Sequence, residues 1–251
     1  GHMVSRLGIE RKVVVGHWSE ENVQKRIASW MRTAIGVIES SHVRVVRVGD
    51  NMRNVAVTEG DKVEAQVKFG WEIDAYNVTD VAEYVQAVSA ADVNALTDEY
   101  YEMYDILLEG RDEKEFREHV KVQAAIELGF RKFLEENDYH AVVTNFQMLS
   151  GLKQLPGLAM QRLMADGYGF GAEGDWKTAA LLRVMKIMTE GLCNGTSFME
   201  DYTYHLEPGK EVILQSHMLE VCPSIANVKP AIKVNPLTMG NREDPARLVF
   251  T

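Results

Sequence analysis

The chain contains little cysteine and no long apolar run. Its two cysteines, Cys193 and Cys222, lack the Cys-x-x-Cys spacing of redox motifs and structural zinc sites. The sequence shows no signal peptide, so we expect a reducing, cytoplasmic environment without disulfides. No segment approaches the ~20 apolar residues that a membrane-spanning helix needs, which argues against a membrane protein.

Clustered positive charge is also missing. The formal net charge is -10, and no group of Lys and Arg could neutralise a row of phosphates, so we expect neither nucleic acid nor anionic membrane as a partner. The Gly-x-Ser-x-Gly signature of serine hydrolases is absent, and Cys222 stands before Pro223 in an apolar run. Covalent catalysis is therefore not expected.

What the sequence does have is 46% apolar residues, enough for a continuous core, in an alternating order of strand and helix patterns. This order predicts an α/β fold: a Rossmann-like, mostly parallel sheet with helices on both faces and ligands at the carboxyl ends of its strands. Expected strands cover residues 12–16, 43–48, 71–76 and 141–145. One expected helix begins at a Ser19 cap. Further helices are expected over 61–69, over two stretches within 79–104, and over 113–136, 158–166 and 175–190.

The last part of the chain has a different pattern. Residues 196–206, 211–219, 231–235 and 247–250 are strand-like and separated by Gly and Pro, which predicts the start of a β-rich, barrel-like domain. We therefore divide the sequence into a tag remnant (1–3), a βα unit (4–42), a central α/β domain (43–190) and a partial β-rich domain (191–251). We expect a chain cut at both ends.

Three side chains in the second half predict a metal site for proton-transfer chemistry. Glu173 and Glu200 lie in Gly-rich or aromatic segments, and His217 lies on an apolar strand. An unpaired carboxylate among apolar groups is costly, so a cation or a shared proton would compensate it. Mixed oxygen and imidazole ligands suit manganese, cobalt or magnesium.

Each of these residues also has a simpler interpretation. Glu173 could merely complement a helix dipole, Glu200 and Asp201 could be a solvent-facing pair at a sheet edge, and His217 could be a hydrogen-bonded core residue. Gly169, Gly171 and Gly174 match Gly-x-Gly-x-x-Gly, but a helix-like segment precedes them, so we expect no dinucleotide site. We expect instead a tight loop that presents Glu173 just before a helix capped by Asp175. His205 and Glu220 are candidates to orient a ligand.

Long runs of this sequence resemble the central part of bacterial L-arabinose isomerases. The runs cover nearly all of the chain after the first three residues and are far longer than regular-expression motifs. They are GDNMR (49–53), GDKVEAQVKFG (60–70), DVNAL (92–96), LKQLPGLAMQRLMADGYGF (152–170), EGDWKTAALLR (173–183), GTSFMEDYTYH (195–205), SHMLEVCPSIA (216–226) and EDPARLVF (243–250).

The resemblance implies a role for each matching residue. Glu173, Glu200 and His217 correspond to metal ligands, usually for manganese, and the two glutamates are also the implied catalytic acid and base. Met52, Phe146 and Phe198 correspond to residues that line the sugar pocket. The implied reaction converts L-arabinose to L-ribulose, with D-galactose to D-tagatose as a side reaction, in a homo-oligomer that is a hexamer in the full-length family.

The sequence also departs from the family pattern. The sequence does not include the family's fourth metal ligand, a more C-terminal histidine, or most of the family's N-terminal region. In addition, the residues at Lys233, Asn235 and 238–244 differ from those expected for the family. Two alternatives therefore stay open beside the isomerase. One is a catalytically incomplete fragment that acts as a structural or assembly module, and the other is a related isomerase for another sugar.

Overall fold

The computed structural model describes residues 1–237 and 242–250, so part of the divergent run at 238–244 lies outside the described residues. The strands are β1 (Arg44–Val48), β2 (Glu72–Tyr76), β3 (Asp105–Leu107), β4 (Ala141–Val143), β5 (Gly169–Gly171), β6 (Glu200–His205), β7 (Val212–Ser216), β8 (Ala231–Val234) and β9 (Ala246–Val249). The helices are α1 (His2–Arg6), α2 (Glu21–Ser40), α3 (Lys62–Phe69), α4 (Val78–Gln86), α5 (Ala90–Met103), α6 (Glu113–Glu136), α7 (Gly157–Ala165) and α8 (Trp176–Thr189). Short 3₁₀ turns are η1 (Ala56–Thr58) and η2 (Pro223–Ile225).

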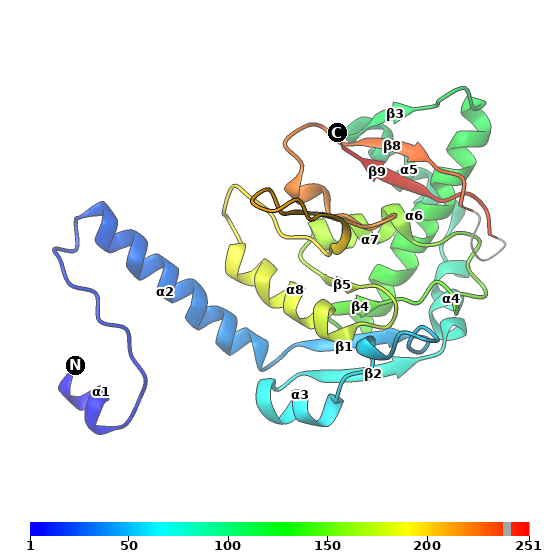
Figure 1. Cartoon of the computed structure of the whole chain (residues 1–251). Helices are drawn as coiled ribbons and strands as arrows, with labels where there is room; N and C mark the ends of the chain where they lie inside the picture. Colours follow the sequence, from blue (N-terminus) through cyan, green and yellow to red (C-terminus); the bar gives the residue numbers. More distant parts are fainter. Residues whose placement is uncertain (238–241, 251) are drawn as a thin grey trace.

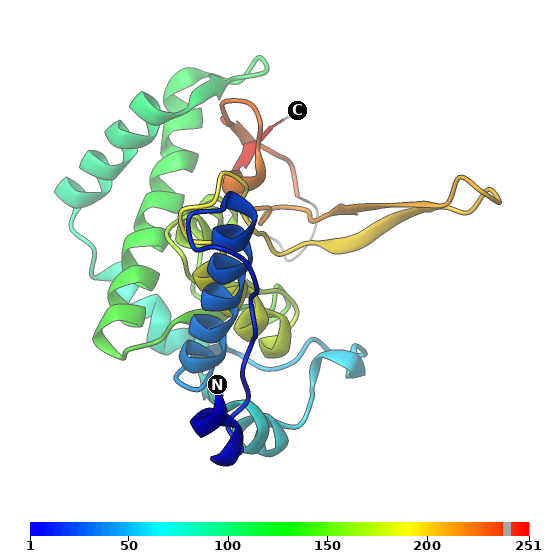
Figure 2. The ribbon, with the colours of Figure 1, turned by 90° about the vertical axis from the view of Figure 1, so that its left-hand side faces the viewer.

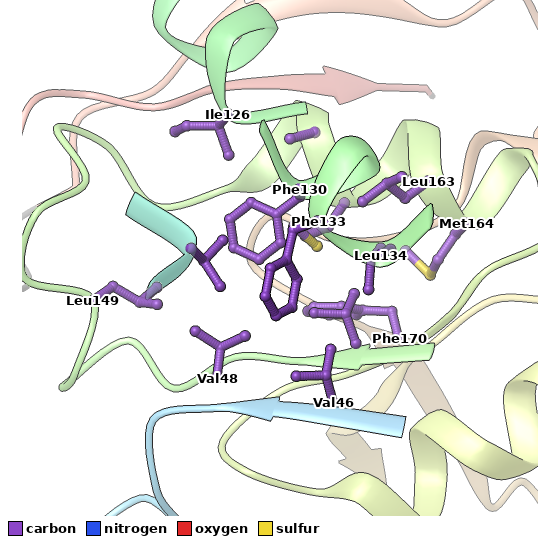
Figure 3. Close-up of a cluster of buried hydrophobic side chains, with 14 of the residues drawn as sticks. Val46, Val48, Ile126, Phe130, Phe133, Leu134, Leu149, Leu163, Met164 and Phe170 are labelled. Carbon is purple, nitrogen blue, oxygen red and sulfur yellow. The ribbon is translucent and has the colours of Figure 1, made fainter. Parts of the chain in front are cut away.

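A four-stranded parallel sheet in the order β2-β1-β4-β5 forms the centre of the molecule (Figure 1). Alternate residues of β1 face opposite sides of it. Val45 packs with α3 and α8, whereas Val46 packs with α4, α6 and α7. Figure 3 shows the second of these clusters, in which Phe130 and Phe133 of α6 lie over Val46 and Val48. The predicted sheet with helices on both faces is thus confirmed.

The longest helix, α6, matches the predicted residues 113–136, and Asp112 caps its first turn by accepting a hydrogen bond from the Glu115 N–H. Ten of its residues are buried, which explains how a highly charged sequence is held against the sheet. In the part of the chain that the structure describes, no helix combines the length and the apolar character that crossing a membrane requires.

Two smaller sheets accompany the central one. Strands β6 and β7 form an antiparallel hairpin, which projects away from the body of the molecule (Figure 2). Strands β3, β8 and β9 form a mixed sheet, in which β3 runs parallel to β8 and β8 antiparallel to β9. The sequence did not predict β3. It therefore did not predict that the central α/β segment, through β3, shares a sheet with β8 and β9 of the last segment.

The N-terminal segment departs from the predicted βα unit. Residues 12–16 belong to no strand, and Val13 and Val15 are 63% and 76% exposed. The prediction was wrong because β-branched residues favour a strand only where a neighbouring strand can pair with them. The predicted Ser19 cap was also wrong: Glu20 is the N-cap of α2, and the Ser19 hydroxyl instead hydrogen-bonds His17 Nδ1 at 2.7 Å. The C-terminal half of α2 packs on α8 (Figure 1).

Candidate active site

Three of the predicted site residues follow parallel strands of the central sheet. Met52 lies in the loop after β1, Phe146 in the loop after β4, and Glu173 in the loop after β5. The carboxyl ends of parallel strands meet at one edge of a sheet, where doubly wound folds bind their ligands. These three residues therefore come from the edge at which a site is expected.

The Glu173 loop is held by both of its neighbours. The Met52 N–H donates to the Glu173 carbonyl at 3.0 Å, and the Gly174 N–H donates to the Thr144 carbonyl at 3.2 Å. Glu173 has φ 58°, in the left-handed region that non-glycine residues rarely adopt. Backbone strain of this kind persists only where the surrounding contacts fix it, and it is found most often at functional sites.

The glycines before Glu173 act differently from the prediction. Gly169 and Gly171 lie in strand β5, so the predicted tight loop is wrong for them and begins only at Ala172. A Cβ atom on Gly171 would lie 2.2 Å from the Asp175 carbonyl oxygen, so glycine is needed for α8 to approach the sheet. The predicted cap at Asp175 is confirmed, since its carboxylate accepts from the Lys177 and Thr178 N–H groups.

Glu200 and His217 lie at the base of the β6–β7 hairpin. Glu200 is the first residue of β6 and pairs with Ser216, and His217 follows directly after β7. The hairpin register therefore places the two side chains together, with Glu200 Oε1 3.9 Å from His217 Nε2. Asp201, the neighbouring acid, is exposed, as expected for adjacent residues of a strand.

His217 is packed and hydrogen-bonded. Its side chain is 8% exposed, Nδ1 lies 2.5 Å from Glu220 Oε2, and the Phe198 ring stands edge-on to it at a centroid distance of 4.9 Å. Glu220, one of the two candidates to orient a ligand, is thus hydrogen-bonded to His217. The suggested role of His205 is wrong, because this residue lies at the far end of β6, 54% exposed and 3.4 Å from Glu207.

Burial and charge shift the ionisation of two site residues. Burial, followed by the nearby charge of Glu200, raises the pKa of Glu173. Burial alone would lower the pKa of His217, but the hydrogen bond and charge of Glu220, together with Glu200 and Glu173, outweigh burial and raise it. The three predicted residues therefore share one electrostatic environment.

A cavity of about 20 Å³ lies between these elements, with Phe146, Glu173, His217 and Glu220 in its wall. That volume holds about one water molecule, not a sugar. Phe146, one of the three residues predicted to contact the sugar, lines this cavity. Phe198 instead is 3% exposed and packs between His217 and Phe170, so it lies behind the imidazole.

The donors suit a divalent cation in their chemistry, since carboxylate oxygens and an imidazole nitrogen are good ligands for manganese or cobalt. Their spacing is less complete. Across residues 1–237 and 242–250, no three His, Cys, Asp or Glu side chains are gathered closely enough to hold a metal ion. Glu200 and His217 lie together, and Glu173 is on the wall of the cavity that His217 also lines.

Comparison with known proteins identifies the family. The family model of the L-arabinose isomerase central domain matches residues 44–191, more than half of the chain. The chain belongs to the L-arabinose isomerase family. The models of the family's C-terminal and N-terminal domains match residues 195–251 and 1–42.

Curated L-arabinose isomerases resemble this chain along its whole length. The enzyme of Geobacillus stearothermophilus is 59% identical over 250 residues, and those of Geobacillus kaustophilus and Halalkalibacterium halodurans are each 58% identical over 250 residues. Each match covers 100% of this chain and 50% of the relative. The chain thus spans about half the length of the L-arabinose isomerases that it matches.

Sequence reasoning missed two residues that support this part of the L-arabinose isomerase fold. Asn145 is fully buried after β4, where its amide donates to the Asp50 carbonyl at 2.8 Å and its side-chain oxygen accepts from the Gln147 N–H. A polar residue at the end of a buried strand could have indicated it. Arg247 of β9 donates to the Met218 carbonyl beside His217. No local pattern predicts that contact, because it joins two distant segments.

Proposed function

We propose that this chain carries active-site residues of an aldose-ketose isomerase that converts L-arabinose to L-ribulose, with D-galactose to D-tagatose as a side reaction. One observation carries the proposal. Glu200 lies 3.9 Å from His217, Glu173 shares a cavity wall with His217, and the pKa of Glu173 is raised by burial and by Glu200. The names of the relatives supply the sugar.

The reaction moves a proton between two carbon atoms of an open-chain sugar. A base removes the proton from C2 to give an enediol and returns it to C1, while an acid–base group passes the hydroxyl proton from O2 to O1. Glu173 and Glu200 are proposed for these two functions. The raised pKa of Glu173 suits this residue to such a function, since a catalytic group works best when its pKa is close to the working pH.

The proposed cofactor is Mn²⁺, with Co²⁺ or Mg²⁺ as alternatives. Glu173, Glu200 and His217 would hold it. A cation bound there would polarise the carbonyl and the adjacent hydroxyl and so stabilise the negative charge of the enediol. The apolar neighbours Phe146 and Phe198 keep the surroundings dry, which strengthens these electrostatic interactions.

A second candidate function is a structural or assembly module with an incomplete site. It is favoured by the cavity of about 20 Å³ and by the lack of a three-residue metal cluster among the described residues. Exposed apolar side chains on α2, including Trp30 and Ile38, favour homo-oligomers in either case. We also propose a cytoplasmic location. A related isomerase that acts on a sugar other than L-arabinose is the alternative to the proposed reaction.

Ketose formation tests the leading proposal. L-arabinose is incubated with the purified chain, with and without Mn²⁺, and L-ribulose is measured. We expect Glu173→Gln and Glu200→Gln each to reduce turnover by about 10²–10⁴-fold. Asp201→Asn is the matched control, since it changes the exposed acid next to Glu200 and should leave turnover unchanged. A folded chain without turnover would favour the assembly module.

A further inference from the structure

We propose that Glu220 is a positioning residue that fixes the orientation and tautomer of His217. The inference rests on the proposed function, in which His217 would be a metal ligand. The ligand atom would then be Nε2. Glu220 acts through the imidazole.

The bend after β7 builds the contact. His217 and Glu220 are three residues apart in a segment that is neither helix nor strand, and the bend brings Nδ1 within 2.5 Å of Oε2. Both side chains are 8% exposed. A hydrogen bond to a carboxylate at this distance is strong, and little water competes for it.

The contact decides which ring nitrogen is available. A carboxylate only accepts hydrogen bonds, so Nδ1 must carry the proton that it donates to Glu220. In the neutral ring, the free electron pair then lies on Nε2, which is the nitrogen 3.9 Å from Glu200 Oε1. Carboxylate partners orient histidine ligands in the same manner in many metal sites.

Two further contacts hold the segment. The Phe198 ring stands edge-on to the imidazole at an interplanar angle of 78°, which limits rotation of the ring. The Arg247 guanidinium donates to the Met218 carbonyl, between the two partners, and ties the bend to β9. Glu220 makes no other side-chain hydrogen bond among the described residues, so its burial is compensated by His217.

The nitrogen-15 NMR spectrum of His217 in the metal-free protein tests the proposal directly, at a pH that leaves the ring neutral. A His217→Asn variant assigns the signals. We expect the wild-type ring to be protonated on Nδ1. Glu220→Gln keeps a side-chain oxygen that accepts the hydrogen bond, so it should keep this tautomer. Glu220→Leu, apolar and of similar size, should give a mixture of both tautomers.

Calorimetric titration with Mn²⁺ gives a second readout. We expect the dissociation constant to rise about 10–100-fold in Glu220→Leu and much less in Glu220→Gln. The chain offers a matched control in Glu207→Gln, which alters another His–Glu pair, His205 and Glu207, on the same hairpin but exposed. This control should bind Mn²⁺ as the wild type does.

The outcomes separate the two proposals. An unchanged Nδ1–H tautomer in folded Glu220→Leu overturns the positioning role. A tautomer change in Glu220→Leu supports it even if the wild-type chain binds no Mn²⁺ and forms no ketose, in which case the proposed function alone fails. If Glu220→Leu does not fold, Glu220→Ala replaces it: a mixture of tautomers supports the role, and an unchanged Nδ1–H tautomer overturns it.

Discussion

Glu173 combines two unfavourable features in one residue. Its backbone has φ 58°, a conformation that costs a non-glycine residue about 1–3 kcal/mol, and its carboxyl group sits where burial and Glu200 oppose ionisation. The hydrogen bonds from Met52 and to Thr144 hold the loop in this state. The residue is thus placed for a purpose other than the stability of the fold.

The raised pKa of Glu173 predicts a pH-dependent stability. Because the folded protein holds this proton more tightly than the unfolded chain, the contribution to stability is present below the ordinary carboxyl pKa. It is lost as the pH rises through the raised value. Metal-free Glu173→Gln should therefore unfold at higher urea concentration than the wild type at neutral pH, with the gain vanishing below about pH 4.

Urea unfolding at both pH values checks this prediction. Glu102→Gln, which changes an exposed glutamate on α5, is the control and should show no such pH-dependent gain. An equal gain for Glu173→Gln at both pH values would contradict the electrostatic origin of the effect.

Much of the residue-scale picture could be predicted from sequence, because capping and short-range pairing are local. The Asp175 cap was predicted, and Glu220 was named as a candidate to orient a ligand. The left-handed conformation of Glu173 was not predicted, since it results from hydrogen bonds to two other loops. The position of Phe198 behind His217 was also missed, because its packing against Phe170 depends on the whole core.

At the scale of elements, the site depends on how closely α8 lies on β5. Gly171 and Ala179 face each other in this contact, and a Cβ on Gly171 would meet both the Asp175 carbonyl oxygen, at 2.2 Å, and the Ala179 Cβ, at 3.3 Å. A backbone oxygen cannot move away cheaply. Helix α8, whose N-cap Asp175 lies two residues after Glu173, would have to shift.

Gly171→Ala should therefore lower the free energy of unfolding by about 1–3 kcal/mol and displace Glu173. Urea unfolding measures the first effect, and the turnover assay the second. Gly209→Ala is the control. A Cβ atom added to Gly209, in the hairpin, would meet no other part of the protein within 4 Å, so only backbone strain of about 1 kcal/mol is expected. Equal losses in turnover for the two variants would contradict a specific effect on the site.

A buried ion network joins α5, α6 and α7. Glu127 is 1% exposed and accepts hydrogen bonds from Tyr100 at 2.5 Å, Arg131 at 2.9 Å and Arg162 at 3.1 Å. The network connects the helices on the face of the sheet opposite α8. Removing its single central anion would leave two arginines without their shared buried partner.

Glu127→Gln should thus cost about 3–5 kcal/mol of the free energy of unfolding, measured by urea denaturation. The comparison variant is Glu136→Gln, on the same helix, where a half-exposed carboxylate accepts from Tyr84. Its expected cost is below about 1 kcal/mol. Similar costs for both variants would mean that burial of Glu127 contributes little.

At the scale of the whole molecule, apolar side chains are exposed along α2 at helical spacing. Ile27, Trp30, Met31, Ile35 and Ile38 are each 40% to 60% exposed. An exposed apolar stripe of this extent is typical of a surface that another protein segment covers. This stripe on α2 therefore favours association.

Replacing Trp30 and Ile38 together by Glu should reduce self-association, seen in sedimentation velocity as a smaller species at equal concentration. Charged side chains would have to lose water in any apolar contact. Val67→Glu is the control, because Val67 is 81% exposed on α3, away from the stripe. An unchanged sedimentation coefficient in the double variant would remove α2 from the association surface.

The sequence predicted the class of the fold because its periodicities are local. The exact range of α6 and three strands of the central sheet, β1, β2 and β4, follow from such patterns. Strand β5 does not, since its residues were expected to form a loop. It could not predict β3, three residues long, since Asp105–Leu107 becomes a strand only by pairing with β8. For the opposite reason, Val13 and Val15 have strand propensity but no partner strand in the described residues.

The pairing of β3 with β8 also has a consequence for synthesis on the ribosome. Asp105 pairs with Ala231, which is made 126 residues later. At about 5–20 residues per second, β3 waits roughly 6 to 25 seconds for its neighbour. During that time the central sheet and its helices can already be in place, and the hairpin that carries Glu200 and His217 emerges before β8. The order of translation thus delivers the site residues first and the strands that close the mixed sheet last.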